Sequence, residues 1–312
     1  MRAAETDAMT TPNAGSGSDV APGVNAGAGA RPSAVTPVWK FLVFVLASSV
    51  SFLAFRTVMS PLAAVIEPAI GVRLPTYVLT LCGGMLVGHW WTFRQLEPHG
   101  WRLIGLDRGA LSWAKVLGGA ALGAAAVGVP LVVLLGIGWL RFEAALPGDV
   151  WRVALFSLGL LIPAALWEEL LARGYLLALL RKQFGARVAI VVTSVGFGAM
   201  HLTNAGATAQ SIALVTLAGV FLGSILVSLQ SLYAAWAAHV AWNFVMAGVM
   251  HASVSGIGMG TPNYRMVDAG PDWATGGAWG PEAGIFAGAG MVLAMYFLLR
   301  RRSARGVDTD VG

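Results

Sequence analysis

Two adjacent acids, Glu168 and Glu169, interrupt an otherwise apolar stretch of the chain that ends at Arg173. A charged side chain inside a bilayer costs about 2.5–3.5 kcal/mol even on the mildest scale. Both acids must therefore face the interior of a helix bundle or a water-filled cavity, and a pair placed there calls for a chemical explanation.

Helix geometry separates the two acids. Glu169 and Arg173 are four residues apart, so a helix places them on one face, where they can form an ion pair. Glu168 points to another sector of the helix and lacks that partner. We therefore expect Arg173 to hold Glu169 ionised and Glu168 to be free to act on water as a general base. The other interpretation is that both acids pair with Arg173 and cap a helix end at the membrane surface.

Two histidines lie in two further apolar stretches. His201 follows Phe197 by four residues, so the phenyl ring shares its helix face and can pack under the imidazole. His239 precedes Asn243 by four residues, and the amide can orient the imidazole or join it in binding water or a metal ion. Either histidine alone is more typical of helix packing. Together with the acidic pair they predict a catalytic cluster built from three helices.

The elements that must position these side chains are membrane helices. Of the 312 residues, 57% are hydrophobic and 11% are charged, whereas a soluble protein has about 25% charged residues. Apolar runs of about 20 residues predict an all-α polytopic bundle of about eight transmembrane helices. The predicted spans are 39–59, 76–93, 114–139, 153–172, 187–203, 210–229, 231–250 and 282–299. We expect the fourth helix to continue past Arg173 towards Leu180, and segment 94–115 to lie at the membrane interface.

The net charge of +5 does not indicate nucleic-acid binding, because the basic residues form short clusters between apolar runs and no stripe. The clusters follow the second, fourth and eighth predicted spans, and the alternate loops are poor in Lys and Arg. This pattern predicts a multi-pass protein of the cell membrane with both termini cytoplasmic. Its partners would include membrane lipid and no nucleic acid. We expect the cavity to be reached from the cytoplasm, because the Glu168 end of its helix runs towards a basic loop.

The remaining histidines and the cysteine have structural interpretations. Cys82 is the one cysteine of the sequence, so it can form no intrachain disulfide and is expected to be a small buried hydrophobe. His89 precedes two tryptophans and is expected to pack or to lie at the membrane interface. His99 and His251 are expected to be solvated.

Three motifs, taken in order, resemble those of a known family. Glu-Glu-x-x-x-Arg at 168–173, Phe-x-x-x-His at 197–201 and His-x-x-x-Asn at 239–243 are similar to the motifs of the CAAX protease and bacteriocin-processing family (CPBP or Abi) of intramembrane endopeptidases. The resemblance covers about residues 150–250, and the N-terminal spans match only in hydropathy and number. It implies an eight-helix membrane fold and a substrate that is a membrane protein or peptide, which in eukaryotic members is a prenylated C-terminal tail.

The resemblance also implies roles for the residues. Glu168 matches the acid that activates water, the two histidines match the family's pair, and Asn243 would support the oxyanion or the water. Glu169 with Arg173 would lock the fourth helix against its neighbours. Glu168, His201 and His239 match the ligand count of a zinc hydrolase, so one interpretation is that these three side chains bind Zn²⁺. A metal-free mechanism, in which a histidine polarises the carbonyl, uses the same residues. The sequence has no His-Glu-x-x-His zinc motif.

These observations divide the chain into five parts. They are a disordered tail (1–36), three N-terminal transmembrane helices with an interfacial segment (37–150), a CAAX protease-like catalytic core (151–250), an outer loop (251–281), and a last helix with a basic cytoplasmic tail (282–312). An intramembrane endopeptidase is the first interpretation. A non-catalytic membrane scaffold or bacteriocin self-immunity protein is the alternative, and a proton-coupled transporter that uses the buried acids and histidines as a relay is the third.

Overall fold

The computed structural model describes residues 35–70 and 74–303, and the secondary structure in that part of the chain is almost entirely helical. The helices of 13 residues or more are α1 (Val35–Ile70), α2 (Thr76–Leu96), α4 (Trp113–Gly136), α5 (Val150–Arg173), α6 (Tyr175–Ala199), α7 (Ala209–Leu229), α8 (Leu232–Phe244) and α10 (Ile285–Ser303). Shorter elements are α3 (Gly100–Leu103), α9 (Asp272–Thr275), and the paired strands β1 (Leu140–Ala144) and β2 (Tyr264–Asp268). The all-α prediction is confirmed. The predicted tail over 1–36 lies, up to position 34, outside the described residues.

Five stretches of the described residues are long and apolar enough to cross a membrane. They are Thr36–Ala69, Trp113–Gly136, Val150–Ala199, Ala209–Leu229 and Leu232–Val249, and the third of these contains both α5 and α6. A shorter apolar stretch, Ile285–Arg300, lies in α10. Many large hydrophobic side chains of α1, α4 and α6 are exposed, as expected for helices whose surroundings are lipid. The chain is therefore a multi-pass membrane protein.

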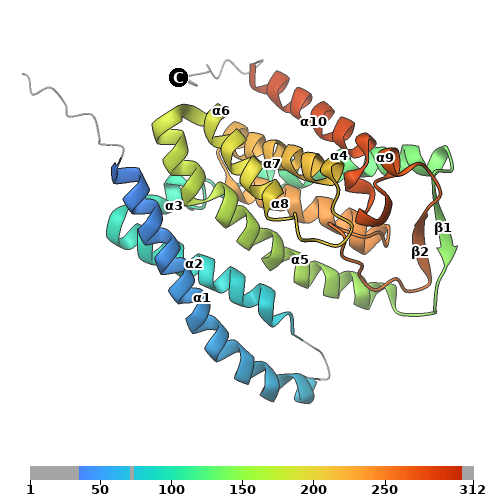
Figure 1. Ribbon diagram of the computed structural model, residues 1–312, viewed down its shortest axis with the longest axis horizontal. Helices are drawn as coiled ribbons and strands as arrows, with labels where there is room; N and C mark the ends of the chain where they lie inside the picture. Colours follow the sequence, from blue (N-terminus) through green and yellow to red (C-terminus); the bar gives the residue numbers. More distant parts are fainter. Residues whose placement is uncertain (1–34, 71–73, 304–312) are drawn as a thin grey trace, which may run out of the picture. The chain divides into compact units, whose positions relative to one another are not determined.

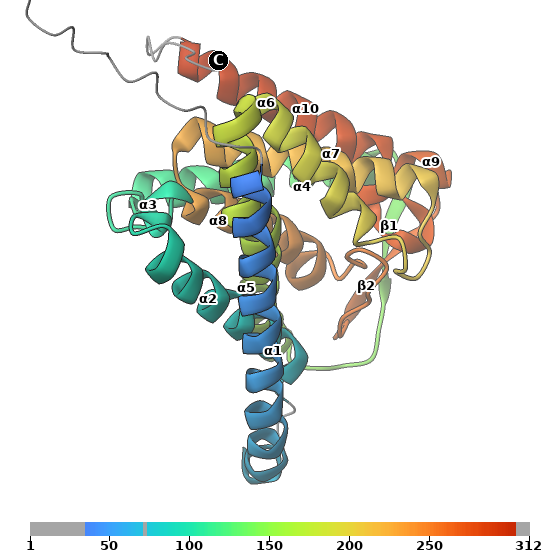
Figure 2. The same ribbon diagram turned by 60° about the vertical axis from the view of Figure 1, so that its left-hand side comes forward.

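Helix α5 lies in the middle of the bundle, where it packs against α2, α6 and α8 (Figure 1). α1 and α2 run side by side as a pair, with α1 at the front of Figure 2. α4 packs against α8, α6 packs against α7, and α10 contacts both α4 and α7. This arrangement brings α8, which carries His239, and α6, which is followed by His201, against the helix that carries the acidic pair.

Helix α8 is positioned by a very close approach to α4. Gly119 and Gly123 lie one turn apart on α4, and a Cβ at these positions would overlap the carbonyl oxygens of Ala234 and Ala238, respectively. Small residues at this spacing let two membrane helices approach until their backbones touch, which maximises van der Waals contact. His239 follows Ala238 in the chain, so this contact fixes the position of its imidazole.

Helix α5 ends at Arg173, so the prediction that it continues towards Leu180 is wrong. Gly174 has φ −78° and ψ −130°, which is not helical, and α6 begins at Tyr175. A side chain at position 174 would overlap the backbone of α5 and would press against Nε2 of His89. That imidazole nitrogen accepts a hydrogen bond from the backbone N–H of Tyr175 at 3.3 Å. The break depends on a side chain from α2, which no local pattern around position 174 indicates.

A second break divides α6 at Gly185, where φ is 80° and ψ is 167°. This region of backbone conformation is essentially open to glycine alone. The chain turns back at this point, and the second half of α6 runs alongside α7 (Figure 1). The predicted fifth span, 187–203, corresponds to this second half.

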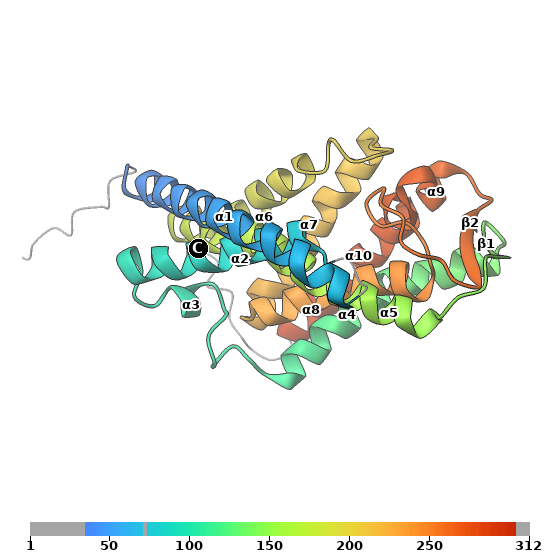
Figure 3. The same ribbon diagram turned by 90° about the horizontal axis from the view of Figure 1, so that it is seen from below.

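The loops gather at two ends of the bundle. At the basic end, loop 97–112 meets the turn at 230–231, where the Ser231 hydroxyl donates to the carbonyl of Ala110 at 2.9 Å. At the ribbon end, loop 200–208 meets segment 250–284, where the Asn204 amide donates to the carbonyl of Ser255 at 2.9 Å. Figure 3 shows the β1–β2 ribbon and α9 together at this second end. The basic clusters that follow the second and fourth predicted spans meet at the basic end, where Lys182 lies 3.4 Å from Glu97.

Glu97 joins three helices at the basic end. Its carboxylate accepts hydrogen bonds from Lys40 at 2.7 Å, from the Tyr175 hydroxyl at 3.3 Å and from Lys182 at 3.4 Å. Burial raises the pKa of Glu97, but the hydrogen bonds and charges of the two lysines outweigh burial and hold that pKa below its usual value. The ionised carboxylate thus ties α1 and α6 to the end of α2.

The predicted outer loop over 251–281 contains β2, which pairs antiparallel with β1. His251 is buried, so the prediction that it is solvated is wrong: Nδ1 donates to the carbonyl of Tyr264 at 2.8 Å, and the two rings stack 4.1 Å apart. This contact forms only because the ribbon folds residue 264 back over residue 251. His89 and Cys82 are buried and His99 is exposed, as predicted.

Candidate active site

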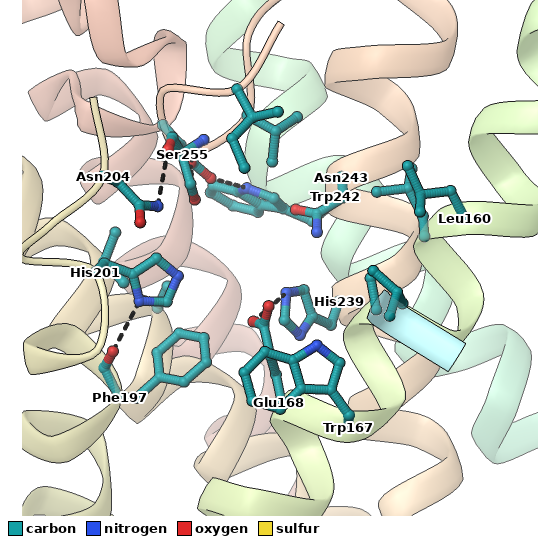
Figure 4. A pocket seen from close by; sticks show the side chains of 18 of the residues that line it. Leu160, Trp167, Glu168, Phe197, His201, Asn204, His239, Trp242, Asn243 and Ser255 are labelled. Atoms are coloured by element: carbon teal, nitrogen blue, oxygen red, sulfur yellow. Dashed lines mark hydrogen bonds and ion pairs between the residues drawn. The ribbon is translucent and has the colours of Figure 1, made fainter. Parts of the chain in front are cut away.

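A cavity of about 300 Å³ gathers four of the six predicted site residues, Glu168, His201, His239 and Asn243. The side chains of Glu168 and His239 point towards one another, and His201 faces them across the opening (Figure 4). α5, the turn that follows α6, and α8 supply these residues. The residues placed in one cluster by the sequence therefore share one cavity, apart from Glu169 and Arg173, which lie behind its wall.

The Glu169–Arg173 ion pair is present and fully buried. Nη1 of Arg173 lies 3.1 Å from Oε1 of Glu169, and both side chains have an exposed fraction of 0%. Nη2 of Arg173 donates to the carbonyl of Gly219 on α7 at 3.0 Å, and the guanidinium lies 4.2 Å from the centre of the Phe197 ring on α6. The pair therefore connects α5 to α6 and α7. The side chain of Glu168, by contrast, is 20% exposed and borders the cavity.

His239 lies between the two acids. Its Nδ1 is 3.0 Å from Oε1 of Glu169, and its Nε2 is 3.7 Å from Oε2 of Glu168. Beside Arg173, Glu169 is a carboxylate and can only accept, so Nδ1 carries the hydrogen and Nε2 is the nitrogen that faces Glu168. The 3.7 Å separation is longer than a hydrogen bond, which leaves the two groups within reach of a shared water. Glu169 therefore orients this ring. Among the described residues, Asn243 forms no hydrogen bond with it.

His201 lies in the turn after α6 and is held by the last turn of that helix. Its Nδ1 lies 2.8 Å from the carbonyl oxygen of Phe197, and the two rings are 5.0 Å apart, so the phenyl ring packs against the imidazole as predicted. A carbonyl oxygen only accepts, so Nδ1 must carry a hydrogen. In the neutral ring, Nε2 then carries the lone pair, and the cavity receives a hydrogen-bond acceptor.

The predicted metal ligands do not form a metal site in this arrangement. Among the described residues, no three His, Cys, Asp or Glu side chains are placed so that they could hold one metal ion. Glu168 and His239 face His201 from the opposite side of the cavity (Figure 4). A three-ligand zinc site needs its donor atoms about 2 Å from a common point. The donor set is chemically suited to zinc, but its positions do not fit such a centre.

Residues 150–245 match the family model described as type II CAAX prenyl endopeptidase Rce1-like. The match supports the CAAX protease family for this segment. The matched segment runs from the first residue of α5 to the end of α8, and it contains all six predicted site residues. The match supports a CAAX-type intramembrane endopeptidase in general. A search of curated proteins finds no match.

A buried acid outside the CAAX protease segment was missed by the sequence analysis. Glu282 lines the cavity and accepts four hydrogen bonds, from the indole N–H groups of Trp242 (3.0 Å) and Trp279 (3.1 Å) and from the backbone N–H (2.6 Å) and hydroxyl (2.8 Å) of Ser255. These bonds hold segment 251–284 against α8. The sequence did contain a signal for this residue. Glu282 is at the first position of the predicted span 282–299, and a charged side chain in a membrane span is energetically unfavourable, as for Glu168.

The remaining lining places the cavity in the ribbon half of the bundle. Its apolar wall comes from the start of α2, the middle of α5 and α7, and includes Tyr77, Val78, Leu81, Leu160, Trp167 and Phe221. Its loop residues come from the ribbon end, and are Asn204, Val254, Ser255, Ile257, Met259 and Glu282. The described loops of the basic end contribute none. The cavity therefore lies closer to the ribbon end than to the basic loops, and its access from the cytoplasm stays a prediction.

Proposed function

We propose that this protein is an intramembrane endopeptidase that hydrolyses a peptide bond in a membrane-associated protein or peptide. The observation that carries the proposal is the pair of facing side chains, Glu168 and His239, in a buried cavity with His201 opposite. The CAAX protease family match of residues 150–245 supports the same reaction class. The helices would span the cell membrane and both termini would lie in the cytoplasm, because the basic clusters follow alternate predicted spans.

Glu168 would act as the general base. Its carboxylate takes a proton from a water in the cavity while the water oxygen attacks the carbonyl carbon of the substrate peptide bond. The tetrahedral intermediate then expels the amine, which must receive a proton. Nε2 of His239 is 3.7 Å from Glu168 and can return that proton through water, because Glu169 holds the ring with Nε2 facing Glu168.

His201 and Asn243 would divide the remaining work. Neutral His201 presents Nε2 as an acceptor, so it can hold the second hydrogen of the attacking water but cannot donate to the carbonyl oxygen. The amide N–H₂ of Asn243 is a donor that lines the same cavity, so it would stabilise the oxyanion. Asn243 thus takes the role of polarising the carbonyl, in place of His201.

The charges of the buried cluster balance when one proton is shared between Glu168 and His239. Glu169 and Arg173 cancel one another at 3.1 Å. If Glu168 is ionised, a protonated His239 neutralises it, and if His239 is neutral, a protonated Glu168 carries no charge. Because an unpaired buried charge is strongly unfavourable, the resting cluster is expected to hold one proton between these two groups. The second proton, taken from water during the attack, is balanced by the negative charge of the oxyanion until the leaving amine receives a proton.

The apolar wall indicates the kind of substrate. The residues from α2 and α5 are lipid-compatible side chains such as Val78, Leu81 and Leu160, which would bind an apolar segment or a lipid-modified chain end. A water-soluble peptide would gain little from this wall. Membrane protein or peptide substrates that enter from the lipid are therefore expected, with the surrounding lipid as a constant partner.

We propose the metal-free form of the mechanism. The supporting observation is that the donor atoms of Glu168, His201 and His239 do not converge on one point among the described residues. Cleavage is expected to continue in the presence of EDTA or 1,10-phenanthroline. Loss of cleavage with chelator, restored by added Zn²⁺, would show instead that the three side chains move together around a metal.

The test is cleavage by the purified full chain in detergent or nanodiscs, with quenched fluorescent peptides that carry an apolar segment or a lipidated C-terminus. Glu168→Gln and His201→Ala are expected to lower kcat by about 10²–10⁴-fold, and Asn243→Ala by about 10²–10³-fold. Glu143→Gln is the matched control, because this exposed acid lies on β1 and does not line the cavity. Thermal unfolding midpoints establish that each variant is folded.

Two outcomes would overturn the proposal. Cleavage that survives both Glu168→Gln and His201→Ala would show that another site performs it. Absence of cleavage with every substrate class, together with a cellular phenotype that Glu168→Gln leaves unchanged, would favour the non-catalytic scaffold or self-immunity interpretation.

A further inference from the structure

A second cavity, of about 710 Å³, lies at the basic end of the bundle, behind the active-site wall. Its lining comes from segment 102–115 and from the start of α6, together with Leu226 and Gln230 at the end of α7. It shares none of the residues that line the first cavity. This cavity has no role in the proposed peptidase mechanism.

The charged side chains of this cavity are almost all positive. Four of the cations are Arg102, Lys115, Arg181 and Lys182, and the single acid among the lining residues is Asp107. Lys182 is paired with Glu97 at 3.4 Å. In the described part of the chain no carboxylate forms an ion pair with the other three cations. An excess of unpaired positive charge around a concave surface attracts anions strongly.

A fifth cation forms part of the cavity wall. Arg173 lines the cavity and is only 1% exposed, whereas Arg102 and Arg181 are exposed. Its two terminal nitrogens bind Glu169 and Gly219, but its Nε–H has no hydrogen-bond partner among the described residues. A buried donor without a partner costs about 1–3 kcal/mol, so an acceptor that reached it would be favoured.

We propose that this cavity binds a phosphate-bearing anion. Guanidinium groups bind phosphate oxygens through paired, charge-assisted hydrogen bonds, and lysine adds a compact charge. The cavity volume accommodates a phosphorylated headgroup or a free pyrophosphate. Its position at a basic end of a membrane bundle is where anionic headgroups lie, and the exposed Leu111 and Trp113 beside Lys115 suit the edge of a bilayer. This site goes beyond the proposed peptidase function and does not depend on it.

Two probes distinguish the sources of phosphate. The purified full chain in detergent is titrated with inorganic pyrophosphate, at constant ionic strength, and separately with a short-chain phosphatidylglycerol. The zwitterionic phosphatidylcholine of equal chain length is the reference for the lipid. Binding is followed by the rise of the thermal unfolding midpoint, since a ligand that binds only the folded protein stabilises it.

The variants are two double substitutions that remove the same charge. Arg102→Gln with Arg181→Gln alters the cavity, and Arg108→Gln with Arg187→Gln alters exposed arginines of the same loop and the same helix that do not line it. The cavity variant is expected to weaken binding by about tenfold or more, since each lost charge-assisted bond is worth about that factor. The control variant is expected to change binding by less than about threefold.

The outcomes are decisive in both directions. Saturable binding of both probes, lost in the cavity variant alone, supports a general phosphate site, and binding of phosphatidylglycerol alone assigns the source to lipid. Binding of pyrophosphate alone assigns it to a soluble anion. Equal weakening in the two double variants, or no saturable binding of either probe to the unaltered chain, overturns the proposal. None of these readouts requires peptidase activity, so the proposed function stands or falls separately.

Discussion

Nδ1 of His239 lies 3.0 Å from Oε1 of Glu169, the same oxygen that Nη1 of Arg173 approaches at 3.1 Å. One carboxylate oxygen thus holds both a buried cation and the imidazole that faces Glu168. This relationship gives the two adjacent acids separate tasks, one internal and one facing the cavity. The two tasks can be measured separately, because substitution of Glu169 should affect stability and substitution of Glu168 should affect activity.

Replacement of Glu169 should mainly affect stability. Glu169→Gln leaves the guanidinium of Arg173 buried without a counter-charge, which is expected to lower the free energy of unfolding by about 3–5 kcal/mol. Glu168→Gln faces the cavity and should change stability by less than about 1 kcal/mol while it abolishes most cleavage. Thermal and chemical unfolding in detergent measure the first quantity. Equal losses of stability in the two variants would contradict the assignment.

The close contact between α4 and α8 offers a second test. A methyl group at Gly123 would overlap the carbonyl of Ala238, whereas a Cβ at Gly118 meets nothing within 4 Å. Gly123→Ala should destabilise the protein by about 1–3 kcal/mol through overpacking and should lower kcat, since α8 carries His239. Gly118→Ala should be neutral or stabilising by up to about 1 kcal/mol, because alanine has the higher helix propensity. The same unfolding assay and cleavage rates compare the pair.

Glu282 is expected to position a wall of the cavity and not to take part in proton transfer. Glu282→Gln replaces one acceptor oxygen by a donor that faces an indole N–H or Ser255, which should cost about 1–3 kcal/mol. We expect KM to rise more than kcat falls, because the wall that it holds contacts substrate. The exposed Glu143, paired with Arg265 at 3.1 Å, provides the control substitution to Gln. A fall in kcat alone would argue for a direct chemical role.

The side of the membrane that each end faces can be read by cysteine labelling. Leu146 at the ribbon end is 85% exposed, and Arg108 at the basic end is also exposed. In intact cells a membrane-impermeant maleimide should label Leu146→Cys and leave Arg108→Cys unlabelled until the membrane is permeabilised. The unaltered chain is the background, since Cys82 is 7% exposed. The reverse pattern would place the catalytic cavity on the cytoplasmic half.

The sequence by itself determined the contacts that lie within one helix, because helix geometry alone decides them. Glu169 and Arg173 are four residues apart, as are Phe197 and His201, and both pairs are in contact because every α-helix places such positions on one face. The membrane class and the number of long helices followed from apolar runs of the right length. These inferences required no knowledge of which helices are neighbours.

Only the tertiary structure decided the contacts between helices and loops. The bond from His239 to Glu169 joins residues 70 positions apart, and the break at Gly174 depends on His89 of α2. The bond from Glu282 to Trp242 spans 40 positions, and it closes the cavity with a segment that shows no periodic pattern. Such contacts depend on which helix faces which and at what depth, and side-chain packing across the whole bundle sets both. For that reason the sequence indicated which side chains gather in the site, while the fold decided how they are oriented and which other side chains surround them.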